Sequence, residues 1–98
     1  MKRARFVSGA TREFLAEVAY YEEAQPGEGA HFIDAVRYAV ARALAFPSSG
    51  SPAAAGTRRT LVRDFPFSVI YRVESDGILV VAIAHSAKRP GYWQTRVR

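Results

Sequence analysis

The 98-residue chain carries 14 Lys and Arg against 9 Asp and Glu, which gives a formal net charge of +5 with both His neutral. Its length limits it to a single domain over residues 1–98, and its 49% apolar residues are enough for a core without cross-links. Because the chain has no Cys, a disulfide scaffold, a thiolate zinc site and a Cys nucleophile are excluded.

The excess of positive charge lies in one part of the sequence. Residues 1–56 hold six basic and six acidic groups, whereas residues 57–98 hold eight basic groups and three acidic ones. The basic start of the chain is not followed by the apolar stretch of a signal peptide, and no segment reaches the roughly 18 apolar residues of a membrane span. We therefore expect a cytoplasmic protein with no membrane partner.

A short strand followed by two helices is predicted for the first half. Residues 3–7 alternate weakly between polar and apolar. From Ala10, apolar residues recur every three or four positions, as on one face of a helix, and Ser8 is placed to cap that helix. Turn residues at 25–29 separate it from a second apolar stripe, from Phe32 to Leu44. Such a short connection favours an antiparallel helical hairpin.

Three strands are predicted for the second half. The small residues at 48–56 indicate a mobile surface loop, after which the apolar period becomes two. The last strand is a continuous apolar run, which is typical of a strand buried on both faces near the centre of a sheet. The predicted fold class is α+β: an N-terminal strand, an antiparallel helical hairpin, a three-strand antiparallel meander and a short C-terminal tail. The meander strands are expected at residues 57–63, 67–73 and 78–84.

Several short motifs in the second half occur together in a known group of proteins. They are Arg58-Arg59 ahead of a strand, the segment Phe65 to Arg72, Asp76-Gly77-Ile78 and the run His85 to Trp93. With them, the sequence resembles the RelE/ParE superfamily, the bacterial toxins of type II toxin–antitoxin pairs. The tail, where His85 precedes a basic pair, a Pro and a Trp, is more similar to the ParE branch.

This resemblance implies a partner and two alternative targets. The partner is a cognate antitoxin protein, in an assembly that can be of higher order, and no cofactor is implied. ParE-type toxins are described as DNA gyrase inhibitors, whereas RelE-type toxins are endoribonucleases that cut mRNA on the ribosome. RelE-type nucleases gather several Lys and Arg with a C-terminal Tyr around the scissile phosphate, and this chain departs from that pattern because it has Lys only at positions 2 and 88. We therefore favour a gyrase-binding protein that inhibits growth and stabilises plasmids, and keep the endoribonuclease as the alternative; a relic without potent activity also stays open.

The endoribonuclease alternative selects one set of candidate catalytic residues. Removing the proton from an RNA 2′-OH needs a base, and His85 is the candidate because imidazole titrates near neutrality. Arg59, Arg63 and Arg89 are candidates to hold the phosphate, and Tyr92 to act as an acid or stack on a base. The competing interpretation is that His85 is a structural residue at the end of a strand. No metal site is expected, since the two His lie far apart in the sequence.

Cations interleaved with aromatic residues form the candidate surface for binding the target, because such residues stack on bases and dominate protein interfaces. Two simpler interpretations compete with this one: the arginines near residue 60 protect an edge strand, and Trp93 packs the tail onto the sheet. In that strand, side-chain alternation places Arg59 and Arg63 on one face. The candidate target-binding residues are Arg58, Arg59, Lys88, Arg89, Tyr92, Trp93 and Arg96.

Overall fold

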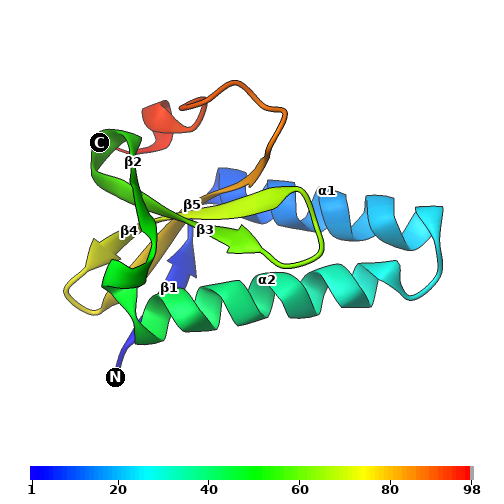
Figure 1. Ribbon diagram of the computed structural model, residues 1–98, viewed down its shortest axis with the longest axis horizontal. Coiled ribbons are helices and arrows are strands. Elements are labelled where there is room, and N and C mark those ends of the chain that lie inside the picture. Colours follow the sequence, from blue (N-terminus) through cyan, green and yellow to red (C-terminus); the bar gives the residue numbers. More distant parts are fainter. Residues whose placement is uncertain (98) are drawn as a thin grey trace.

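The computed structural model describes residues 1–97 and consists of a helical hairpin packed on a five-stranded sheet (Figure 1). Among these residues, no helix is both long enough and apolar enough to cross a membrane. The helices are α1 (Ser8–Ala24) and α2 (Glu28–Ala45), and short 3-10 turns occur at Pro47–Ser49, Ala54–Gly56 and Gln94–Arg96. The strands are β1 (Arg3–Phe6), β2 (Ser51–Ala53), β3 (Thr57–Val62), β4 (Phe67–Glu74) and β5 (Gly77–His85).

The sheet has the strand order β1-β5-β4-β3-β2. The antiparallel meander β3-β4-β5 confirms the prediction for the second half, and β5 lies in the interior of the sheet, as its apolar run indicates. β1 pairs with β5 in parallel, from Arg3 opposite Gly77 to Phe6 opposite Val80. The predicted α+β class is confirmed, and the sheet is mixed because the helical hairpin carries the chain from β1 to the far side of the meander.

The prediction of a mobile loop at 48–56 is wrong. Its centre forms β2, which pairs antiparallel with the first half of β3, so that β3 is covered there by another strand. The hydroxyl of Tyr71 in β4 fixes this segment through two hydrogen bonds. It donates one to the carbonyl of Pro47 (2.7 Å) and accepts one from the Gly50 N–H (3.2 Å). Arg58 adds a 2.7 Å bond to the Gly50 carbonyl. These contacts order a segment whose composition alone indicates flexibility.

Each face of the sheet is covered by a separate apolar cluster. On the helical face, Phe32 is fully buried and contacts the rings of Phe14, Tyr21, Phe65 and Phe67. Buried aromatic side chains remove a large apolar surface from water and therefore contribute much of the stability of a small core. The second cluster lies on the opposite face, under the C-terminal tail, and contains Ile70, Val81, Ala82, Ala84 and Trp93.

An irregularity in the pairing of β4 with β5 supplies part of the second cluster. Tyr71 lies opposite Val80 and Ile70 opposite Ala82, so Val81 is an extra residue without its own partner. Such a bulge reverses the alternation locally, which brings the consecutive residues Val81 and Ala82 into the same cluster. β5 is buried on both faces because the helical hairpin covers one face and the C-terminal tail covers the other.

A carboxylate fixes the junction between the two helices. Glu22 near the end of α1 accepts hydrogen bonds from the backbone N–H groups of Gly27 (3.0 Å) and Gly29 (3.1 Å) at the start of α2. These are donors that the helix itself leaves without acceptors. The predicted cap at α1 is wrong: Val7 is the capping residue, Ser8 is already helical, and no side-chain cap is present among the described residues.

His31 joins α2 to the turn after β3. Its Nε2 lies 3.0 Å from an Asp64 carboxylate oxygen and its Nδ1 3.2 Å from one of Glu28. The hydrogen bond to Asp64 first, and that to Glu28 second, raise the pKa of His31 above 6.5. Because the pKa of His31 is higher in the folded state than in the unfolded state, its contacts with the two carboxylates stabilise the fold fully at a pH below the unfolded-state pKa. This stabilisation is lost as the pH rises through the folded-state pKa.

We therefore expect a pH-dependent effect of His31→Gln. Urea unfolding should show a larger loss of stability at about pH 5.5, below the unfolded pKa, than at an alkaline pH above the raised folded pKa, where the wild-type imidazole is no longer charged. His85→Gln serves as a comparison, because His85 contacts no carboxylate among residues 1–97. An equal loss from His31→Gln at both pH values would contradict the prediction.

Candidate functional site

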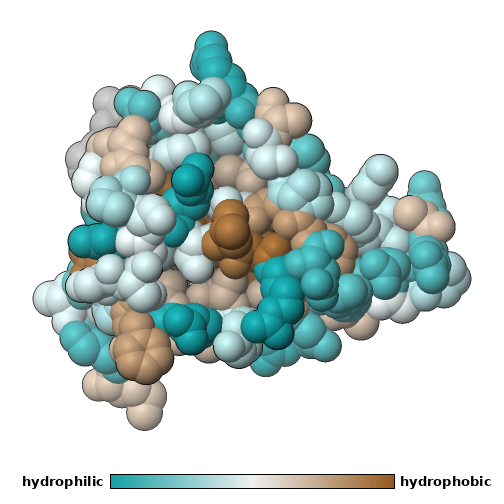
Figure 2. Space-filling view, viewed as in Figure 1, coloured by the Kyte–Doolittle hydropathy of each residue, from teal (hydrophilic) through white to brown (hydrophobic). Residues whose placement is uncertain are grey.

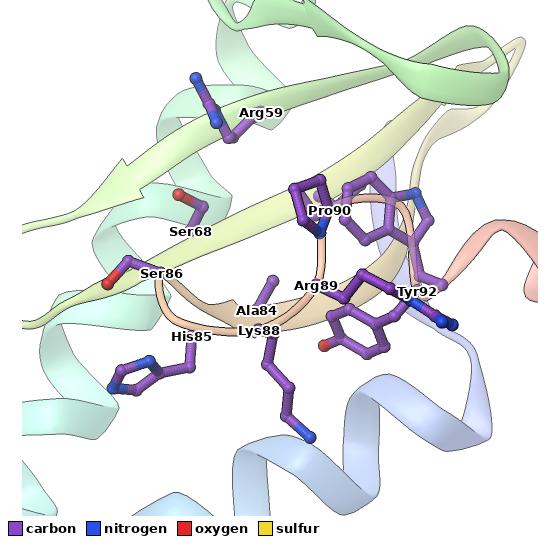
Figure 3. A pocket seen from close by; sticks show the side chains of 11 residues that line it. Arg59, Ser68, Ala84, His85, Ser86, Lys88, Arg89, Pro90 and Tyr92 are labelled. Atoms are coloured by element: carbon purple, nitrogen blue, oxygen red, sulfur yellow. The ribbon is translucent and has the colours of Figure 1, made fainter.

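A small cavity of about 120 Å³ lies between the sheet and the C-terminal tail, and we call it the tail pocket (Figure 3). β3 contributes one side through Arg59, β4 the floor through Ser68, and the end of β5 contributes His85. The tail closes the other side. Its lining residues are Arg59, Ser68, Ile70, Ala84, His85, Ser86, Lys88, Arg89, Pro90, Tyr92 and Trp93.

The tail reaches this position through a series of tight turns after β5. The Ser86 N–H donates to the carbonyl of Pro66 (2.8 Å), and the Lys88 N–H donates to that of His85 (3.0 Å). Gly91 then adopts a φ of +77°, a conformation that residues with a side chain rarely adopt. The chain reverses here and brings Trp93 under the sheet, where it is 7% exposed.

Three exposed cations surround the tail pocket. Arg59, Lys88 and Arg89 contact no carboxylate among residues 1–97, although Lys88 lies 5.5 Å from the centre of the Tyr92 ring. Figure 3 shows Arg59 and Lys88 on opposite sides of the pocket with their side chains pointing away from one another. The cations therefore spread positive charge over a surface instead of converging on one point, an arrangement suited to attracting an acidic partner.

His85 is held by its own loop. Its Nδ1 accepts a hydrogen bond from the Ala87 N–H (2.9 Å), so in the neutral ring the proton is on Nε2. The ring packs edge-on against Phe67, with 4.9 Å between centroids. Because one nitrogen is occupied and the other carries a proton, His85 has no free lone pair to act as a base in this arrangement.

Tyr92 and Arg96 converge on Glu13 of α1, and we call these three residues the tail clamp. Arg96 donates to both carboxylate oxygens of Glu13, at 3.0 and 3.1 Å, and the Tyr92 hydroxyl donates to one of them at 2.5 Å. Burial, and next the hydrogen bond to Glu13, raise the pKa of Tyr92 far above its usual value. Hydrogen bonding to Glu13 likewise raises the pKa of Arg96. The phenol of Tyr92 is therefore engaged in holding the tail.

The tail clamp also completes the edge of β5. β1 ends opposite Val80, so the backbone groups of β5 that point away from β4 beyond that residue have no strand beside them. Arg96 donates to the Val81 carbonyl (3.0 Å), and Glu13 accepts from the Ile83 N–H (3.0 Å). Two side chains thus supply the hydrogen bonds that a longer β1 would make.

The structure separates the predicted site residues into groups. The tail pocket unites Arg59, His85, Lys88, Arg89, Tyr92 and Trp93. The expectation that Arg63 shares a face with Arg59 is wrong, because β3 ends at Val62 and Arg63 turns to lie 5.0 Å from the Tyr38 ring of α2. Arg58 bonds to backbone carbonyls near β2, and Arg96 belongs to the tail clamp.

Glu13 is the residue of this region that sequence reasoning missed. It lies 70 positions before Ile83 and 83 before Arg96 in the chain. In the sequence, Glu13 is a polar residue beside the apolar stripe of α1, and no local pattern distinguishes it from Glu17. Among residues 1–97, no group of three or more His, Asp or Glu is placed to hold a metal ion.

Comparison with known proteins identifies the family. The model of the family described as "ParE toxin of type II toxin-antitoxin system, parDE" matches residues 5–90, from β1 to the turns of the tail. The chain therefore belongs to the ParE toxin family of type II toxin–antitoxin systems, as the resemblance to the ParE branch indicates.

A solved structure shares the fold. A chain in the structure titled "Chromosomal ParDE TA system from P. aeruginosa" superposes with a TM-score of 0.73 at 18% sequence identity, and the alignment covers 87% of this chain and 96% of that one. Among curated proteins, none matches this sequence at a significant level.

Proposed function

We propose that this toxin acts by binding and inhibiting DNA gyrase, and that a cognate antitoxin neutralises it. Membership of the ParE family supports this proposal. One observation favours binding over catalysis: both groups that could transfer a proton are already hydrogen-bonded within the protein. His85 Nδ1 accepts a hydrogen bond from the Ala87 N–H, and the Tyr92 hydroxyl donates one to Glu13. In the cytoplasm, loss of the antitoxin would then free a growth inhibitor, which stabilises a plasmid that encodes both proteins.

The surface for the target is the rim of the tail pocket. Arg59, Lys88 and Arg89 are exposed and have no acidic partner among residues 1–97, so they are available to an acidic surface on the target. Trp93 is buried and supports this surface from beneath. Tyr92 contributes its ring, over which Lys88 and Arg96 both lie.

A second candidate function, mRNA cleavage on the ribosome, is favoured by one observation: Arg59, His85, Arg89 and Tyr92 line the same pocket. It requires His85 to release its bond to Ala87 and Tyr92 to leave Glu13. Purified toxin assayed in parallel against gyrase supercoiling and against mRNA on ribosomes separates the two functions. Cleavage of mRNA with no effect on supercoiling would overturn the gyrase proposal.

Charge reversal at the rim tests the proposed surface. We expect the double variant Lys88→Glu, Arg89→Glu to need an about tenfold higher concentration for half-inhibition of supercoiling, because an attractive charge becomes repulsive. Arg37→Glu is the matched control: it reverses an exposed arginine on α2 that lines none of the cavities described here. Equal inhibition by the rim variant and the control would show that the target binds elsewhere.

A further inference from the structure

The side of α1 that faces away from the sheet is exposed to solvent, and we call it the α1 outer face. It carries two large apolar side chains, Leu15 at 58% exposure and Tyr20 at 64% exposure. Two alanines lie between them, and one charged residue lies toward each end. The residues of this face are Arg12, Leu15, Ala16, Ala19, Tyr20 and Glu23, all of them exposed. Large apolar side chains grouped on an exposed helix face are typical of a contact surface.

Helical periodicity sets the arrangement of this face. At about 3.6 residues per turn, Arg12 and Glu23 are about three turns apart, so they lie on one line along α1. This line runs opposite Tyr21, which packs on the core. The two alanines lie close to the line, and Leu15 and Tyr20 lie further out, one on each flank. The face therefore has a small apolar centre between two ridges, with a positive charge at one end and a negative charge at the other.

The α1 outer face ends in two charges that are available to a partner. Neither Arg12 nor Glu23 forms an ion pair among residues 1–97. Figure 1 shows the hairpin extending beyond the strands at the end where α1 joins α2, and Figure 2 shows hydrophilic side chains around that end. Glu23, near the end of α1, therefore lies on a projecting part of the molecule that another molecule can reach.

The charges of this face are complementary to those of a second copy that lies antiparallel to it. A two-fold axis at the middle of the face brings Arg12 to the level of Glu23 of the second copy, and Glu23 to the level of its Arg12. Opposite charges then meet at both ends of the contact. A parallel pair of α1 helices would instead bring like charges together, so the charges select the antiparallel arrangement.

The side chains of the face also match in size. In the same antiparallel pair, Leu15 lies beside Ala19 of the second copy, and Tyr20 lies beside its Ala16, so each large side chain covers a small one. The alanines at the centre let the two helices approach closely. Each of these contacts occurs twice, because a two-fold interface uses the same surface on both copies.

We propose that this chain forms a two-fold symmetric homodimer through the α1 outer face, with the two α1 helices antiparallel. Two ion pairs between Arg12 and Glu23 flank an apolar centre made by the leucines, tyrosines and alanines of both copies. Because one pair of helices buries a small interface, the dimer dissociates on dilution. The inference goes beyond the proposed function and does not depend on it, since the dimer uses no residue of the tail-pocket rim.

Other occupants match the α1 outer face less well. A nucleic acid or an anionic membrane would attract Arg12, but Glu23 at the other end would repel it. A different helical protein would need an apolar stripe with its two charges in the reverse order, which a second copy supplies by symmetry. Residues 1–56 carry as many acidic as basic groups, so the net charge of +5 does not lie in the helical half of the chain.

Sedimentation velocity of the purified chain tests the dimer. We expect the mass to rise from 10.8 kDa toward twice that value as the concentration increases from micromolar to millimolar. Arg12→Glu and Glu23→Arg should each raise the dissociation constant about tenfold or more, since each brings like charges together at both ends. The double variant Arg12→Glu, Glu23→Arg should restore the wild-type constant, because it exchanges the two charges and keeps the pairs.

Arg37→Glu is the matched control for the charge variants. It reverses an exposed arginine on α2 outside the α1 outer face, and it should leave the dissociation constant unchanged. Thermal melting checks that each variant is folded. A wild-type chain that stays at 10.8 kDa up to millimolar concentration would overturn the inference. So would a dimer whose dissociation constant the single charge variants leave unchanged, because that dimer would use another surface.

Cross-linking tests the position of the two-fold axis independently. Because the chain has no Cys, Ala16→Cys introduces a single thiol near the proposed axis. We expect oxidation by copper phenanthroline to convert this variant into a disulfide-linked dimer, while Arg37→Cys stays largely monomeric under the same conditions. Equal cross-linking of the two variants would overturn the proposed arrangement.

Discussion

Replacing Glu13 by Gln is expected to lower the free energy of unfolding by about 2–3 kcal/mol and to loosen the C-terminal tail. The amide keeps the shape of the side chain but removes its charge, so the Arg96 guanidinium loses its ion pair while still largely shielded from water. The NH₂ group of Gln also replaces one of the two oxygens that accept from Arg96, Tyr92 and the Ile83 N–H. Removing one partner of such an ion pair lowers the stability by more than the intact pair contributes, because the other partner is left as a poorly solvated charge.

The effect of Glu13→Gln can be followed by urea unfolding and by the fluorescence of the single tryptophan, Trp93, which lies in the tail. Glu17→Gln is the matched control, one turn further along α1, since Glu17 has no ion pair among residues 1–97. The control should change stability by less than about 0.5 kcal/mol. Similar losses from the two variants would show that the tail clamp contributes little.

The parts of the fold that sequence patterns predict are those fixed by local periodicity. The apolar stripes of α1 and α2 and the alternation in β3 and β4 reflect one face turned toward a core, which is visible within a few residues. β2 escapes this reasoning because its residues are small and its order depends on Tyr71, 20 or so positions away. Its order arises from long-range hydrogen bonds that leave no local signal.

The candidate site shows the same division between residue type and residue direction. The basic excess after residue 57 includes the three exposed cations of the tail pocket, because charge is visible in the sequence. Where each cation points depends on where a strand ends: Arg63 leaves the face of Arg59 because β3 stops one residue before it. Whether a polar group is free depends on distant partners, and Glu13 occupies Tyr92 and Arg96 from the other end of the chain.

Trp93→Ala is expected to lower the free energy of unfolding by about 3–5 kcal/mol, the largest effect predicted here. Trp93 is 7% exposed and fills the second apolar cluster beside Ile70, Val81, Ala82 and Ala84. Removing the indole leaves a cavity that the short tail cannot close without losing its own contacts. The free energy of unfolding of a domain of this size is typically about 5–15 kcal/mol. At the lower end of that range, this loss is nearly as large as the whole stability of the domain.

Trp93→Phe separates packing from recognition of the target. The Nε1 of Trp93 is buried without a hydrogen-bond partner among the described residues. Phe removes this unpaired N–H, which is favourable, but it also fills less of the apolar cluster, which is unfavourable. The first effect partly offsets the second, so we expect the free energy of unfolding to fall by about 1 kcal/mol. Urea unfolding measures both variants. If Trp93 acts only through packing, gyrase inhibition should fall in proportion to the unfolded fraction, whereas a folded Trp93→Phe protein that no longer inhibits would show that the indole itself contacts the target.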